Sequence, residues 1–197
     1  MSEQAIQRGL RLEYITLSYN VVEAIVALVS GAVSGSVALI SFGVDSIIEV
    51  SSGAVMIWRL GKCADEAERR AQKLIACSFF ALGGWVLWKA VAGLWAHEDP
   101  RMSWTGIALA ALSLLVMPAL AKAKREVGLT LNSAAMVADS QQTSLCAYLS
   151  AILLAGLLMQ AIAGWWWADA VASLAMTPII FREGLDAWRG KGCGCPH

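Results

Sequence analysis

Six apolar segments, each about as long as a lipid bilayer is thick, constrain this chain more than any other feature. A membrane core of roughly 30 Å is crossed by about 20 helical residues. Segments of this kind cover roughly residues 12–32, 36–60, 73–96, 104–121, 131–158 and 165–182. Hydrophobic residues make up 58% of the 197 positions and charged residues only 15%, whereas soluble domains are about 25% charged. The sequence therefore predicts an all-α, polytopic membrane protein with six transmembrane helices.

The lysines and arginines predict how these helices are oriented. Thirteen of the fifteen, from Arg8 to Lys191, fall on one side of the predicted bilayer, and only Arg101 lies in a loop on the other side. Loops rich in Lys and Arg stay in the cytoplasm. We therefore expect a multi-pass protein of the cell membrane with both termini cytoplasmic. The predicted domains are a cytoplasmic N-terminus at 1–11, a six-helix membrane domain at 12–182 and a short cytoplasmic tail at 183–197.

Charge and motif content exclude two other classes of protein. The net charge is zero, which predicts no basic surface for nucleic acid. The sequence shows no phosphate-binding loop and no pairing of a nucleophile with a base, and both histidines lie outside the apolar segments. We therefore expect neither an enzyme nor a bound prosthetic group.

Ionisable residues inside the apolar segments are the strongest functional signal. Such residues are costly in a membrane and mark ion or substrate pathways. The acids are Glu23, Asp45, Glu49 and Asp139, and the uncharged potential ligands are Asn20, Gln142 and Cys146. Asp45 and Glu49 are one helical turn apart, and no Lys, Arg or His occurs between residues 12 and 58. On this pattern, the two acids have no cationic partner nearby in the sequence.

These polar residues are predicted to lie at one depth in the membrane. Counted from the cytoplasmic end of each predicted helix, Glu49, Gln142 and Glu23 are 11 residues deep, and Asp45 and Cys146 are 15 residues deep. At about 1.5 Å per residue, the five residues fall within a layer roughly 6 Å thick near the middle of the membrane.

A layer of this composition predicts a metal site. The second and fifth predicted helices each present two potential ligands four residues apart, Asp45 with Glu49 and Gln142 with Cys146. Four such ligands suit a tetrahedral divalent cation. Asp139 lies on the same face as Gln142 and Cys146, one turn nearer the cytoplasm. Because ligands must lose protons to bind metal, a site of this kind predicts metal–proton exchange.

Each of these residues also has a structural explanation. Asp45 and Glu49 could be a protonated pair that hydrogen-bonds a neighbouring helix, and Gln142 could bridge two helices. Cys146 could be a small packing residue. Glu23 could orient the ligands or line the approach to them.

Two stretches also carry a family pattern. SGSVALISFGVDSIIEVSSG, residues 34–53, contains two acids separated by three residues. NSAAMVADSQQTSLCAYLSAILLAGLL, residues 132–158, and WWWADAVASLAM, residues 165–176, follow later. These stretches resemble the cation diffusion facilitator family of metal exporters. The first is similar to the family's second helix and the turn before it, the second to its fifth helix, and the third to the start of its sixth helix. In the family's fifth helix, Ala-Asp precedes a His/Asp-x-x-x-Asp pair.

The resemblance implies proton-coupled export of a divalent transition metal by a homodimer. Asp45 and Glu49 match the family's second-helix pair, and Gln142 and Cys146 fall on its fifth-helix pair. Gln and Cys at those positions favour a late metal such as Zn²⁺, Cd²⁺ or Co²⁺, and Asp139 could replace the lost charge. The chain looks like a short form without the family's cytoplasmic C-terminal domain, so a dimer would rest on membrane helices, for example through the FFALGG run at 79–84.

Several features leave other functions open. Cys193, Cys195 and His197 in the tail could hold a thiophilic metal. Asp169 follows three tryptophans and is expected to be a helix N-cap or first-turn acid. The tryptophans cluster at the outer helix ends, as an aromatic belt does. One alternative function is a non-transporting membrane subunit that binds or senses metal. The other is an exporter of small organic cations built around Glu23 and the tryptophans.

Overall fold

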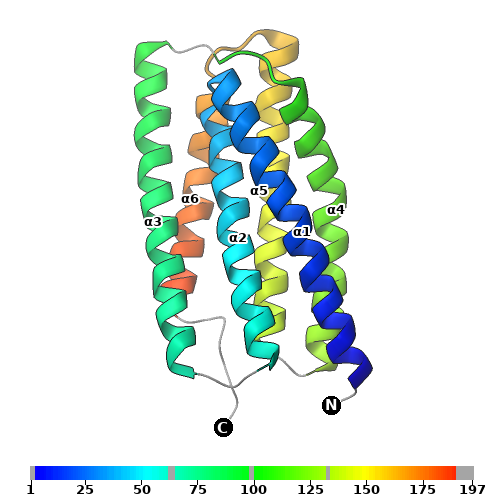
Figure 1. Cartoon of the computed structure of the whole chain (residues 1–197). Helices are drawn as coiled ribbons and strands as arrows, with labels where there is room; N and C mark the ends of the chain where they lie inside the picture. Colours follow the sequence, from blue (N-terminus) through cyan, green and yellow to red (C-terminus); the bar gives the residue numbers. More distant parts are fainter. Residues whose placement is uncertain (1–2, 62–64, 98–99, 132–133, 190–197) are drawn as a thin grey trace.

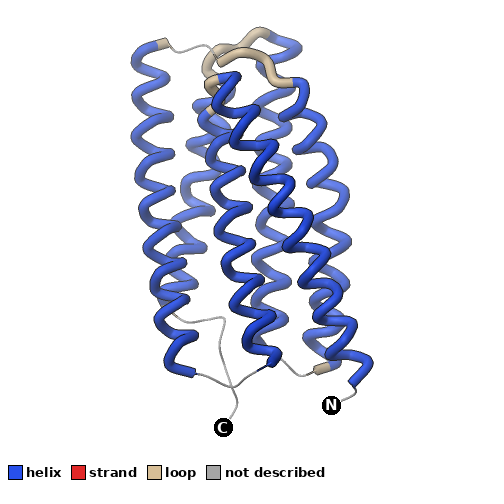
Figure 2. Tube along the Cα trace, viewed as in Figure 1, coloured by secondary structure: helices blue, strands red, loops and turns tan. Residues whose placement is uncertain are grey.

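The chain forms one bundle of six antiparallel helices. The computed structural model describes residues 3–61, 65–97, 100–131 and 134–189. These residues form six helices and no strand (Figure 2). The helices are α1 (Glu3–Ser34), α2 (Val37–Gly61), α3 (Asp65–Ala96), α4 (Trp104–Thr130), α5 (Ala134–Ala163) and α6 (Ala168–Trp188). The start of α1 and the end of α6 point to the same end of the bundle (Figure 1). The all-α fold with six helices is confirmed.

Hydropathy located the apolar spans but underestimated the length of the helices. α1 begins at Glu3 rather than near residue 12, α4 continues to Thr130 rather than 121, and α6 continues to Trp188 rather than 182. The extensions contain Ala, Lys, Arg and Glu, which are good helix formers in water. The apolar pattern marks where lipid contact ends and not where the helix ends. The basic segment after residue 121 was therefore wrongly predicted as a loop.

The outer surface of the bundle is apolar and its interior holds the polar residues. Among the described residues, five helices contain stretches long and apolar enough to cross a membrane: Gln4–Ser34, Val37–Ala54, Phe79–Ala96, Trp104–Thr130 and Asp139–Ala163. On α1, Val22, Ile25 and Val29 are exposed, whereas Asn20 and Glu23 on the opposite face are buried. Apolar side chains outside and polar side chains inside are the arrangement expected when lipid is the solvent.

Two groups of helices make up the bundle. α1, α2, α4 and α5 pack together, and α3 packs mainly on α6 beside α2 (Figure 1). In the α3–α6 seam, a Cβ on Gly83 would lie 3.1 Å from the ring of Phe181. The rings of Phe80 and Phe181 are 6.2 Å apart. Phe80 and Gly83, from the stretch suggested for a dimer interface, are thus used for packing within the chain.

An acid of α6 holds the start of α2. Gly35 makes the turn after α1 with a φ of 77°, a conformation that favours glycine. Asp169, in the first turn of α6 as expected, directs its carboxylate at α2. It accepts hydrogen bonds from the Ser36 hydroxyl, from the Val37 amide at 2.9 Å and from the Ala38 amide at 3.4 Å. A carboxylate at a helix N-terminus satisfies free amides and complements the helix dipole, so Asp169 fixes the start of α2.

Candidate cation site

Three helices bring buried acids and a thiol together in the middle of the bundle. Glu23 of α1, Asp45 and Glu49 of α2 and Cys146 of α5 are all buried. The Cys146 thiol lies 3.8 Å from Oε2 of Glu23, and the Ser46 hydroxyl donates to the same oxygen at 2.8 Å. Glu23 therefore joins α1 to both α2 and α5 at this depth.

Thr143 contacts Glu49 where Gln142 was expected. The Thr143 hydroxyl donates a hydrogen bond of 2.9 Å to Oε1 of Glu49, whereas Gln142 is only half-buried. The buried polar face of α5 therefore runs through Asp139, Thr143 and Cys146, at spacings of four and three residues. These spacings fit one face of a helix as well as the predicted spacings of three and four residues through Asp139, Gln142 and Cys146 do. The sequence carries no signal for this role of Thr143, because a threonine on a helix usually bonds its own backbone or packs.

Asp45 has acidic neighbours. It is buried and interacts electrostatically with Glu23, Glu49 and Glu183, the last of these from α6. Like charges repel strongly where water is excluded. A cation bound near Asp45 would relieve this repulsion.

Buried oxygens without partners mark the same layer. Within the described part of the chain, Oε1 of Glu23, Oε2 of Glu49 and both amide atoms of Asn20 are buried and have no hydrogen-bond partner. A buried polar atom without a partner is costly, and carboxylate and amide oxygens are common ligands for divalent cations. The donor set therefore fits a cation.

The potential ligands are close, but they do not converge in this conformation. Among the residues that the structure describes, no three Asp, Glu, Cys or His side chains are grouped as one metal site. The observed polar contacts are pairwise, between Glu23 and Cys146 and between Glu49 and Thr143. Binding one ion through all the predicted ligands would require side-chain or helix movement.

A buried lysine contacts Asp139. Lys124 was expected in a cytoplasmic loop, but it lies within α4 with only 1% of its surface exposed. Its Nζ is 2.6 Å from Oδ2 of Asp139 and 3.1 Å from Oε2 of Glu13. Asp139 is therefore ion-paired with Lys124 in this structure, and its role as a replacement for the carboxylate that the fifth helix lacks stays a prediction. Asp45 and Glu49 have no cationic partner nearby in the sequence, but α4 brings Lys124 from a distant part of the chain to Thr143, which contacts Glu49.

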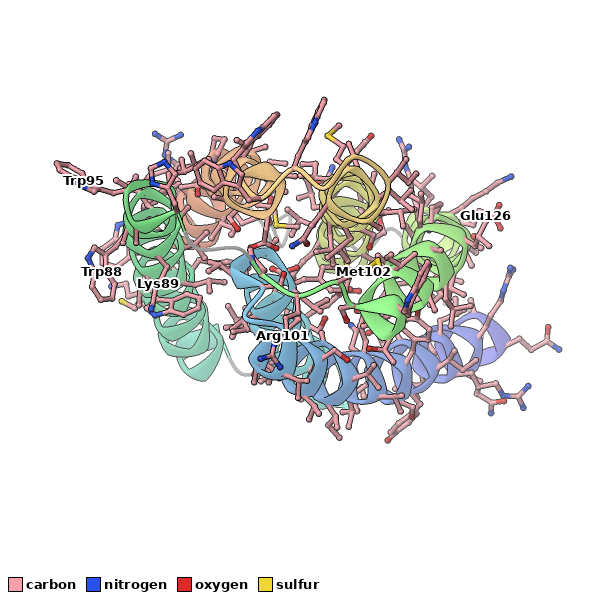
Figure 3. The ribbon with its side chains drawn as sticks, turned by 90° about the horizontal axis from the view of Figure 1, so that it is seen from above. Trp88, Lys89, Trp95, Arg101, Met102 and Glu126 are labelled. Carbon is pink, nitrogen blue, oxygen red and sulfur yellow. The ribbon has the colours of Figure 1, made fainter. Side chains whose placement is uncertain are left out.

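Three of the tryptophans predicted at the helix ends face away from the bundle interior that holds Glu23. Trp88, Trp95 and Trp104 are exposed by 64%, 86% and 68%, whereas Glu23 is 1% exposed. Trp88 and Trp95 point outward from α3 (Figure 3). This arrangement does not fit an organic-cation site built from Glu23 and these rings. The predicted tail site at Cys193, Cys195 and His197 lies outside the described residues.

Comparison with known proteins decides the family. The model of the cation efflux transmembrane domain matches residues 14–189. The chain belongs to the cation efflux family. It is similar to an uncharacterized transporter of Methanocaldococcus jannaschii, with 25% identity in an alignment 178 positions long that covers 85% of this chain and 62% of that protein. It is also similar to an uncharacterized transporter of Synechocystis, with 26% identity in an alignment 176 positions long that covers 83% of this chain and 57% of that protein.

Family membership places this chain among membrane transporters. The cation efflux family consists of membrane transporters for metal cations, so this chain is a multi-pass membrane protein of a cation-transporting family and not one of an enzyme family. It spans about three-fifths of the length of the two relatives it matches.

Proposed function

We propose that this protein exports a divalent transition-metal cation in exchange for protons. The ion binds between α2 and α5, to Asp45, Glu49 and Cys146, with Glu23 reaching the site from α1. The observation that carries the proposal is that Glu23 and Glu49 each keep a buried oxygen without a partner in the layer that holds the Cys146 thiol, 3.8 Å from Glu23.

The ligand types favour a late transition metal. Carboxylates alone suit Mg²⁺ or Mn²⁺, whereas an added thiolate selects for softer ions such as Zn²⁺, Cd²⁺ or Co²⁺. Gln142 joins as a fourth ligand through movement of its side chain or of α5. It lies four residues before Cys146, about 40° from it around the helix axis, and it directly precedes Thr143, which contacts Glu49 here.

Proton exchange follows from the same ligands. A carboxylic acid and a thiol must lose their protons to bind a metal ion, so binding releases protons and protonation releases metal. The Lys and Arg bias supports cytoplasmic termini, and membership of the cation efflux family supports export as the direction of transport. The homodimer implied by the family remains part of this proposal.

Flux measurements on reconstituted protein test the proposal. Purified protein in liposomes with an imposed pH gradient is expected to move Zn²⁺, and Asp45→Asn is expected to abolish the movement. The matched control is Glu126→Gln, which removes a carboxylate that is 53% exposed and pairs with Arg8 at 3.5 Å. This control is expected to transport at the wild-type rate.

Each alternative function has its own outcome in this experiment. Undiminished Zn²⁺ flux in Asp45→Asn would overturn the proposed site. Stoichiometric Zn²⁺ binding without flux in the wild-type protein would identify a non-transporting metal-binding subunit. Competition by organic cations, without competition by Cd²⁺ or Co²⁺, would identify an organic-cation exporter.

A further inference from the structure

Lys124 is surrounded by oxygens from two other helices. Its ammonium group donates to Oε2 of Glu13 at 3.1 Å, to Oδ2 of Asp139 at 2.6 Å and to the Thr143 hydroxyl at 3.4 Å. An ammonium group has three donors and no acceptor, so these three contacts use all of them. The partners come from α1 and α5, whereas Lys124 itself comes from α4.

This environment has the composition of a cation site. Glu13, Lys124 and Thr143 are 0–1% exposed and Asp139 is 7% exposed. Oε1 of Glu13 is buried and has no hydrogen-bond partner within the described part of the chain. Two carboxylates, one with a spare oxygen, and a hydroxyl form an all-oxygen set, which suits hard divalent cations such as Mg²⁺ and Mn²⁺.

We propose that the Lys124 ammonium is a tethered cation that occupies this oxygen-lined site and thereby keeps hard divalent cations out of it. This inference deepens the proposed function, since it concerns which ions the transport pathway accepts.

The charges explain why a tethered cation is needed there. When Glu13 and Asp139 are both ionised, they carry two negative charges against the one positive charge of Lys124, so without Lys124 the pair would attract a divalent ion of matching charge. Thr143 contacts both Lys124 and Glu49. An ion in place of the ammonium would therefore be separated from Glu49 of the proposed transport site only by the Thr143 hydroxyl. Abundant hard cations bound there would repel the transported metal.

Removal of Lys124 should therefore expose a second metal site. Mn²⁺ is the probe, because its electron paramagnetic resonance signal reports the free ion and so counts the bound ions. Lys124→Ala in the full chain is expected to bind one more Mn²⁺ per chain than the wild-type protein. Lys124→Arg keeps the positive charge and is expected to bind no additional Mn²⁺. The double variant Lys124→Ala with Glu13→Gln also removes one of the two carboxylates that Lys124 contacts, and it is expected to lose the additional ion.

Equal Mn²⁺ stoichiometry in folded Lys124→Ala and wild-type protein would overturn the inference, and so would retention of the additional ion in the double variant. If Lys124→Ala unfolds during purification, Mn²⁺ or methylammonium in the buffer is expected to restore folding, as measured by circular dichroism. Failure of both cations to restore it would also overturn the inference. The measurement counts bound ions in purified protein, so it gives a result even if the chain does not transport Zn²⁺.

Discussion

Thr143 of α5 donates a hydrogen bond of 2.9 Å to Glu49 of α2 and receives one of 3.4 Å from Lys124 of α4. Because a lysine can only donate, the Thr143 proton is directed away from Lys124 and towards Glu49. This hydroxyl therefore links the ion-paired cluster of Glu13, Lys124 and Asp139 to the proposed transport site.

Thr143→Val is expected to lower the stability of the metal-free protein. Valine has nearly the same shape but no hydroxyl, so Glu49 loses its donor. Hydrogen bonds between membrane helices contribute about 0.5–2 kcal/mol. Thermal unfolding in detergent measures the loss, and Thr143→Ser, which keeps the hydroxyl, is the matched control. A Thr143→Val protein that unfolds at the wild-type temperature would show that the bond contributes nothing.

Asp169→Ala is expected to destabilise the bundle at the start of α2. The change leaves the Val37 and Ala38 amides without their acceptor, and the loss of a helix cap costs about 0.5–2 kcal/mol. Asp169→Asn, which keeps one acceptor oxygen, is expected to lose less. Thermal unfolding of both variants beside Glu126→Gln provides the measurement. Equal losses for Asp169→Ala and Glu126→Gln would contradict the capping role.

Cys146→Ser is expected to reduce Cd²⁺ affinity more than Co²⁺ affinity. A thiolate ligand contributes more to binding of the softer ion, and we expect at least about a tenfold loss for Cd²⁺, or about 1.4 kcal/mol. Isothermal titration with each metal measures both affinities. Cys77→Ser is the matched control, because Cys77 is an exposed free cysteine on α3. Equal losses for the two metals would place Cys146 outside the ligand set.

Metal affinity is expected to fall as the pH falls. Asp45, Glu49 and Cys146 must release protons to bind metal, so the apparent affinity drops about tenfold per pH unit for each proton released. Titration with Zn²⁺ between about pH 5.5 and 8 spans the useful range. Glu126→Gln is expected to show the wild-type slope and Asp45→Asn a smaller one. A wild-type affinity that is constant over this range would refute competition by protons.

Gly156→Ala is expected to disturb the packing of α5 on α6. A Cβ at this position would lie 2.6 Å from the Cβ of Ala172, and overpacking of this kind costs about 1–3 kcal/mol. Gly84→Ala is the matched control, because a Cβ there meets nothing within 4 Å. Replacing a helical glycine in open space should instead stabilise the protein by about 0.5–1 kcal/mol. The sign of the difference in unfolding temperature between the two variants decides the prediction.

The sequence alone was sufficient for the number of helices and for the turns of α2 and α5 that lie level with each other. Lipid requires every backbone polar group to be satisfied within the chain, so each apolar segment of spanning length must be a helix. Depth then follows from counting residues at a fixed rise. Glu49 was placed level with Gln142, and it contacts Thr143, the next residue of α5.

The rotation of each helix about its axis was decided by the tertiary structure. One residue of α5 separates Gln142 from Thr143, and only packing against α2 determines which of them meets Glu49. Lys124 was assigned to a loop because its neighbours in the sequence are basic, but it is buried through contacts with Glu13, 111 residues away, and Asp139, 15 residues away. Asp169 likewise caps a helix more than 130 residues earlier in the chain. Hydropathy reports contact with lipid, whereas these pairings depend on which interior faces meet once the helices have packed.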